Sequence, residues 1–157
     1  MSAGGLAGAS VNTMMQIGND VLAIFKKLQK KDSITKIKAF QELNNYINLV
    51  ETDSEELPNL LTFFLFHMCR LLLNEQDKLV REAAHESFGV FIKKAKRKLG
   101  PHIKKIFPIW YCTFFDSSPE VARLAKLNFE AAFPPEKQPE VFKLAFKMFL
   151  NFADEQL

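Results

Sequence analysis

The sequence contains few of the residues that build catalytic or metal sites. It has two cysteines and three histidines in 157 residues, and neither Cys69 nor Cys112 belongs to a CxxC or Cys/His pattern. Both cysteines lie inside apolar runs, so we expect buried, reduced thiols and a protein of the cytosol or nucleus. The six glycines are scattered and form no phosphate-binding loop. His85 stands among Ala and Glu, and we expect it to be an ordinary surface histidine.

The sequence also lacks a clear targeting or membrane segment. Residues 1–13 have neither the basic start nor the apolar centre of a signal peptide. The most apolar run, 57–73, is interrupted by His67 and Arg70 and is shorter than the roughly 20 residues that span a membrane. We therefore expect a buried helix there and no membrane partner. Residues 1–18, rich in Gly, Ala and Ser, are expected to be a tail or a cloning remnant, and 19–157 to be one domain.

The net charge of +3 does not by itself indicate a nucleic-acid-binding protein, but the charges are unevenly distributed. Residues 51–92 carry eight acids and three bases, whereas residues 93–105 carry seven bases and no acid. Charge segregated in this way favours a face for an anionic partner. The alternative interpretation is a solvated helix end, where lysines interact favourably with the helix dipole.

Apolar residues recur at three- and four-residue steps through most of the chain, which predicts an all-α fold of about seven helices. No segment shows the alternation that is typical of a strand. The strongest pattern covers 77–115, where Gly100 is expected to end one helix in the left-handed conformation and Pro101 to start the next. Further helices are expected at about 19–28, 33–50, 60–73, 120–133 and 140–153.

Three segments repeat one pattern, and this repetition indicates the architecture. The aligned residues are Thr35, Ala39 and Leu43; Val80, Ala84 and Phe88; and Val121, Ala125 and Phe129. Their spacing in the forties, and the run from Val80 to Ala84 (VREAA), resemble the HEAT repeat. We therefore predict an α-solenoid of HEAT/ARM-like helical repeats, with three helical pairs and a short first helix as a cap. In such repeats acids and arginines stack between neighbours, so four residues are interpreted first as structural: Asp77, Arg81, Asp116 and Arg123.

The repeat pattern leaves two other function classes open. A generic HEAT scaffold, such as a karyopherin or phosphatase-scaffold fragment, would bind peptides or proteins on its concave side. HEAT-like DNA glycosylases place a Trp, an Asp and an Arg around a flipped-out nucleotide, and Trp110, Asp116 and Arg123 supply these residue types. Trp110 falls on an apolar helical stripe, however, so a buried aromatic side chain explains it better.

Two ordered blocks of the sequence are similar to a known family. The first is Lys27 to Leu43 (KLQKKDSITKIKAFQEL). The second comprises Pro108, Trp110, Phe115-Asp116, Glu120-Val121-Ala122, Ala125, Ala131-Ala132-Phe133-Pro134 and Lys137. Together they resemble the listerin family of RING-type E3 ubiquitin ligases, and roughly residues 19–157 resemble the family's N-terminal domain. No Cys/His zinc pattern occurs here. The resemblance therefore implies that the RING, its zinc and the ligase chemistry lie outside this fragment, which is expected to be non-catalytic and without a cofactor.

The resemblance implies a docking module for ribosome-associated quality control in the cytosol. The family's N-terminal domain engages the large (60S) ribosomal subunit together with nuclear export mediator factor, the partner that recognises peptidyl-tRNA. Carried over by position, the family's charged block corresponds to Lys30, Lys31, Asp32, Thr35, Lys36 and Lys38. The charge pattern alone adds a second group of binding candidates, which are Lys93, Lys94, Arg97, Lys98, Lys104 and Lys105. The alternative for the first group is a capped helix start with solvated lysines; in a solenoid, the two groups could line one ridge.

The last predicted helix is apolar around most of its circumference. One stripe, from Val141 to Phe152, is sufficient to pack on the preceding helices. Phe142, Phe146 and Leu150 are expected to remain partly exposed, and an uncovered patch of this kind favours self-association of the fragment.

Overall fold

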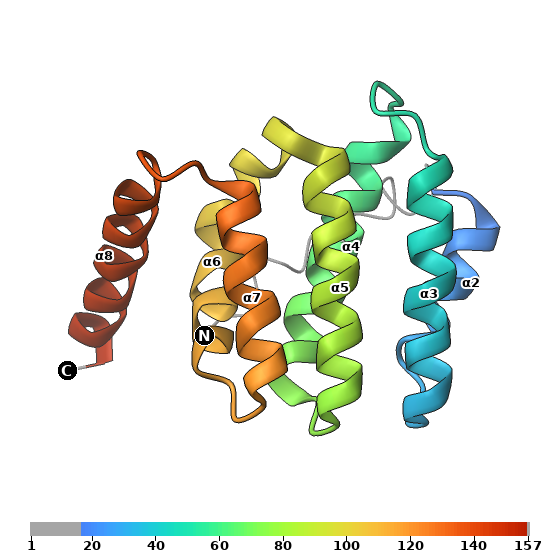
Figure 1. Ribbon diagram of the computed structural model, residues 1–157, viewed down its shortest axis with the longest axis horizontal. Coiled ribbons are helices and arrows are strands. Elements are labelled where there is room, and N and C mark those ends of the chain that lie inside the picture. Colours follow the sequence, from blue (N-terminus) through green and yellow to red (C-terminus); the bar gives the residue numbers. More distant parts are fainter. Residues whose placement is uncertain (1–16, 157) are drawn as a thin grey trace.

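The computed structural model describes residues 17–156, and the regular elements within them are helices (Figure 1). Residues 1–16 of the predicted tail (1–18) lie outside the described range, whereas Ile17 is buried in the core. The α-helices are α2 (Asn19–Lys27), α3 (Ser33–Leu49), α4 (Glu56–Asn74), α5 (Lys78–Ala95), α6 (Ile103–Cys112), α7 (Pro119–Ala132) and α8 (Gln138–Gln156). Two 3-10 helices, η2 (Lys96–His102) and η3 (Thr113–Phe115), flank α6. The all-α prediction is therefore confirmed for this part of the chain.

The helices are arranged in two layers. In the first layer α3, α5 and α7 lie side by side and run in the same direction, with α5 in contact with both neighbours (Figure 1). In the second layer α4 packs against α5 and α6, and α6 contacts α8 at the end of the row. At the other end α2 packs on α3, and its Phe25 ring meets the Phe63 ring of α4 at 4.7 Å. The apolar side of each layer is thus covered by the other.

The small residues of the predicted repeat are all in the core. Ala39, Ala84 and Ala125 are each 0% exposed, at corresponding positions of α3, α5 and α7. Because interaxial distance depends on the side chains at a helix contact, a methyl group permits close approach. Trp110 of α6 is fully buried, as predicted, and its Nε1 donates to the carbonyl oxygen of Ala125 at 2.9 Å. This bond joins the second layer to the first.

The break inside 77–115 lies earlier than predicted. α5 ends at Ala95, and Lys96, not Gly100, has a left-handed φ of 49°. Gly100 lies inside η2 and has no positive φ. A left-handed backbone costs a non-glycine residue about 1–3 kcal/mol. Burial of Leu99, which η2 leaves only 4% exposed, stabilises by about 1.5–3 kcal/mol and offsets that cost.

Two side chains have the opposite environment to the one predicted. Cys112 is exposed because it ends α6 on the solvent side, so Cys69 alone is a buried thiol. Burial raises the pKa of that thiol to about 12. His85 is 0% exposed, because α7 covers its side of α5. There Asn128 donates its Nδ2 to the His85 carbonyl oxygen at 2.7 Å.

By length and composition, α4 is the one helix within residues 17–156 that is apolar enough to cross a membrane. It is a core helix of the domain. Leu61, Phe64 and Met68 are almost fully buried, and the Phe64 ring stacks on Phe91 of α5 with centroids 4.1 Å apart. The prediction of a buried helix at this position is confirmed.

Candidate docking surfaces

A bidentate ion pair joins α5 to the turn before α7. Nε and Nη2 of Arg81 donate to Oδ2 and Oδ1 of Asp116 at 2.9 and 2.8 Å. Nη1 of Arg81 donates to the carbonyl oxygens of Glu75 at 3.2 Å and Gln76 at 2.8 Å. The two charged side chains are only 11% and 10% exposed. Partial burial opposes ionisation, but the bonds from Arg81 and from the Ser118 N–H hold the pKa of Asp116 below its usual value.

The same arrangement occurs one repeat earlier in the chain. Lys36 of α3 corresponds to Arg81 of α5, and it forms an ion pair with Glu75, which precedes α5 as Asp116 precedes α7. These side chains are 13% and 11% exposed. The third corresponding residue is Ala122, so the pattern stops at α7. Two successive ion pairs therefore link neighbouring levels, and Lys36 belongs to the first of them. Of the residues predicted for such a ladder, Arg81 and Asp116 form one pair, whereas Asp77 caps α5 by accepting from the Leu79 N–H at 2.9 Å.

The first predicted group divides into structural and free residues. The Asp32 carboxylate caps α3: its Oδ2 accepts from the backbone N–H of Thr35 at 2.8 Å and from the Thr35 hydroxyl at 2.6 Å. These bonds lower the pKa of Asp32. The three remaining lysines are exposed and, within residues 17–156, have no ion pair. We call Lys30, Lys31 and Lys38 the first basic cluster.

The second predicted group divides in the same way. Lys94 donates its Nζ to the carbonyl oxygen of Asn48 at 3.1 Å, and Lys98 donates to that of Thr52 at 2.5 Å. These two lysines therefore bind the C-terminal end of α3 and the turn that follows it. The other predicted residues are exposed, and Lys96 joins them. We call Lys93, Lys96, Arg97, Lys104 and Lys105 the second basic cluster.

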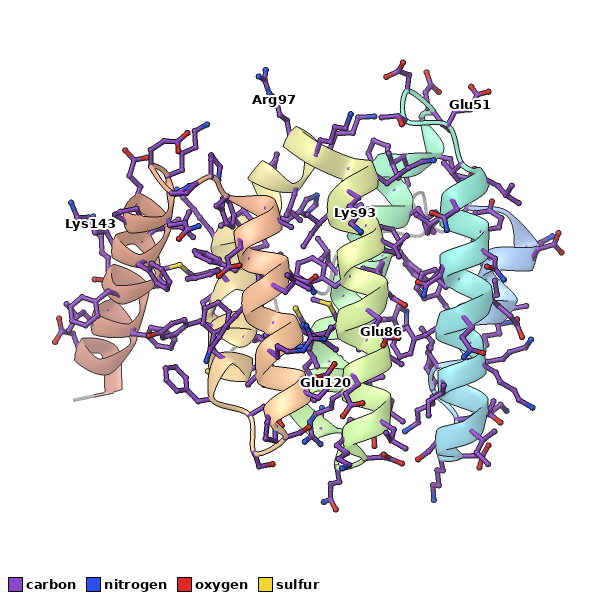
Figure 2. All side chains as sticks on the ribbon, in the orientation of Figure 1. Glu51, Glu86, Lys93, Arg97, Glu120 and Lys143 are labelled. Atoms are coloured by element: carbon purple, nitrogen blue, oxygen red, sulfur yellow. The ribbon has the colours of Figure 1, made fainter. Side chains whose placement is uncertain are left out.

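The two clusters lie at opposite edges of the domain. α3 and α5 run in the same direction, so residues at helix starts and residues at helix ends face opposite ways (Figure 1). Figure 2 shows Lys93 and Arg97 toward the edge that carries Glu51, whereas Glu120 lies toward the other edge. The 17 residues of α3 separate these edges by about 25 Å at 1.5 Å per residue. The expectation of one common ridge is therefore wrong.

A cleft of about 620 Å³ opens beside the second basic cluster, between η2 and the end of α7. Lys93, Lys96 and Arg97 line it from one side. Lys137, in the segment that leads into α8, also lines it. Lys137 belongs to no basic run of the sequence, and only the packing of distant segments brings it to the cluster, so the charge pattern did not predict it as a site residue.

The residue types of a glycosylase site do not converge. Trp110 is fully buried, and Asp116 is bound by Arg81. Arg123 donates its Nε and Nη2 to Glu120 of its own helix, at 2.9 and 2.7 Å, on an exposed surface. Arg123, which was interpreted as a structural residue stacked between repeats, therefore pairs within its own helix instead. In the part of the chain that the structure describes, no group of three or more His, Cys, Asp or Glu could hold a metal ion.

The sequence profile of the "E3 ubiquitin-protein ligase listerin, N-terminal domain" matches residues 15–157. The chain belongs to the listerin N-terminal domain family. Similar curated proteins, each named E3 ubiquitin-protein ligase listerin, come from Mus musculus (39% identical over 79% of this chain), Gallus gallus (35% over 88%) and Schizosaccharomyces pombe (31% over 78%). The chain spans only 7%, 8% and 7% of the lengths of these listerins. No solved structure matches the chain.

Proposed function

We propose that this chain is the non-catalytic docking domain of a listerin-type E3 ubiquitin ligase of the cytosol. It binds the large ribosomal subunit and nuclear export mediator factor during quality control of stalled nascent chains. The RING, its zinc and the ligase activity belong to other parts of the parent protein. The match to the listerin N-terminal domain supports the identity of the parent. The observation that carries the docking role is the pair of exposed basic clusters.

We further infer that the domain is a HEAT-like solenoid. Three features support this: the first-layer helices lie side by side, their alanines correspond, and the ion pairs Lys36–Glu75 and Arg81–Asp116 repeat between levels. In a solenoid each repeat contacts only its neighbours, so both edges stay open along the whole row. Edges of this kind suit a domain that contacts two partners at once.

The first basic cluster is the proposed ribosome contact. Its lysines are exposed, with Lys30 and Lys31 just before α3 and Lys38 in its second turn. Lys30 also lines a cleft of about 440 Å³ together with the charged residues Lys36, Arg70 and Glu75. Contacts with RNA phosphates need such cations but no apolar lining, and they weaken steeply as salt rises. The proposed surface therefore predicts salt-sensitive association with the large subunit.

Co-sedimentation with purified large ribosomal subunits tests this function. The variant Lys30→Glu/Lys31→Glu should lose binding, while Lys36 is left intact because it holds Glu75. The matched control is Lys143→Glu/Lys147→Glu, which makes the same change in net charge at exposed positions of α8. Circular dichroism checks that both variants remain helical. Equal sedimentation of the two variants at every salt concentration would refute the proposed ribosome contact.

A further inference from the structure

We propose that the cleft between η2 and the end of α7 binds an acidic segment of a partner protein, which inserts apolar side chains into it. The inference rests on the proposed docking function. In this proposal the second basic cluster binds a protein ligand, and the first basic cluster, at the opposite edge, binds RNA phosphates. The two edges of the domain would then recognise two chemically different partners.

The rim of the cleft supplies the positive charge. Lys93, Lys96, Arg97 and Lys137 are all exposed, and no ion pair within residues 17–156 includes them. The dipole of α5 accounts for a cation in its last turn, such as Lys93. It does not account for Lys137, which lines the cleft from the separate segment that leads into α8. Cations that converge from separate segments favour an anionic ligand between them.

The floor of the cleft distinguishes a peptide from a nucleic acid. It is formed by Ile92, Leu99, Ile103 and Phe133, which are apolar. Phosphates gain nothing from contact with apolar side chains, and a nucleobase needs an exposed aromatic ring on which it can stack. The Phe133 ring already packs against Phe129 and Trp110, with centroids 5.2 and 6.1 Å away. Apolar side chains of a peptide fit this floor, with acidic neighbours at the rim.

Backbone chemistry on the cleft wall also favours a peptide. Ala131 and Ala132, in the last turn of α7, line the cleft. The last carbonyl groups of a helix have no intrahelical partner, so they can accept bonds from the N–H groups of a bound segment. The left-handed Lys96 also lies on this wall, and backbone strain of that kind clusters at binding sites.

Fluorescence anisotropy with the full 157-residue chain tests the assignment. The probe is a labelled peptide of sequence EELFDELE, with the serine-substituted peptide EESSDESE as its partner and a labelled oligouridine as the nucleic-acid arm. Gly100→Trp blocks the cleft without a change in charge, because a Cβ on Gly100 meets no atom within 4 Å. Arg97→Glu/Lys137→Glu removes rim charge, and Lys30→Glu/Lys31→Glu makes the same charge change at the opposite edge.

We expect the EELFDELE peptide to bind more tightly than its serine partner, and to lose about tenfold or more in affinity in both cleft variants. The Lys30/Lys31 variant should bind it almost as the unmodified chain does. No binding of EELFDELE, unchanged binding by Gly100→Trp, or preference for oligouridine would overturn the inference. Large-subunit sedimentation of the same variants separates the two proposals. A chain that sediments but does not bind the peptide keeps the ribosome contact and loses the cleft assignment.

Discussion

Replacement of Arg81 by Met tests whether its ion pair holds α5 to the turn before α7. Met keeps an aliphatic stem but removes the two bonds to Asp116 and the two to backbone carbonyls. Asp116 is then left 10% exposed, with only the N–H of Ser118 donating to it. Removal of one partner of a largely buried ion pair costs about 3–5 kcal/mol, because the remaining charge stays desolvated. A domain is typically stable by about 5–15 kcal/mol, so the change is large.

Thermal and guanidinium unfolding, followed by circular dichroism, measure this loss. A cost of about 3 kcal/mol lowers the Tm by roughly 6–12 °C in a domain of this size. Arg123→Met is the matched control, because Arg123 makes the same bidentate contact with Glu120 at 59% and 47% side-chain exposure. Solvent screening should leave its midpoint almost unchanged. Arg81→Lys, which keeps the charge but loses the planar fork, should fall between the two.

Equal midpoints for Arg81→Met and Arg123→Met would refute the structural role of the ladder. A loss in Arg81→Met that is unchanged when Asp116 is also replaced by Asn would show that the unpaired Asp116 charge is not the cause of the loss. The double variant matters because it removes the charge that the single variant leaves without a partner.

Three further predictions follow from burial. The pKa of His85 is lowered by desolvation to about 4, so the unfolded chain, with its pKa near 6.5, binds more protons between these values. Stability is therefore lost as pH falls through that window, and His85 contributes about 2 kcal/mol of that loss between pH 7 and 5. Burial also lowers the pKa of His67 to about 4, so in urea unfolding the total loss should shrink in His85→Phe by the His85 share without disappearing. Ala84→Phe overpacks a fully buried position and should cost at least about 1–3 kcal/mol, so an unshifted thermal midpoint would contradict the repeat alignment. Phe146→Ser/Leu150→Ser, at side chains 66% and 50% exposed, should reduce self-association in sedimentation velocity without lowering the Tm, and unchanged association would argue against this patch.

The choice of Phe146 and Leu150 for that experiment comes from the structure. All three residues of the predicted patch on α8 are exposed, as expected from the sequence. Phe142, however, also places its ring 4.9 Å from that of Phe129 and 6.0 Å from that of Phe107. Its replacement would remove core contacts as well as surface area, so it is unsuitable for a test of association.

Helix positions could be predicted because helical periodicity is a local signal. Trp110 was assigned to the core from its stripe alone, and α4 from its composition. The predictions were wrong where a helix distant in sequence determines whether a side chain is buried. His85 has polar neighbours in sequence, but α7 covers it. The turn at Lys96 was not predicted because a positive φ is expected at glycine, whereas here Lys96 adopts it and Gly100 does not.

Which of the candidate binding residues are available to a ligand could not be predicted from the sequence. A lysine in a basic run has the same local signal whether it is free or paired. Lys36 is paired with Glu75, and Lys94 and Lys98 bind carbonyl oxygens near the end of α3. Lys137, which belongs to no basic run, lines the cleft with the second cluster. Contacts with residues distant in sequence therefore determine which of these cations a ligand can reach.

The repeat itself offers a way to separate structural cations from available ones. Lys36 and Arg81 occupy the same repeat position, and each pairs with an acid just before the next first-layer helix. A cation at that position is therefore explained by the stacking of repeats wherever such an acid follows. Lys30, Lys31 and Lys38 lie outside that position and have no ion pair among the described residues. No ion pair within residues 17–156 uses their charge, so these lysines are available to an anionic partner, as the proposed ribosome contact requires.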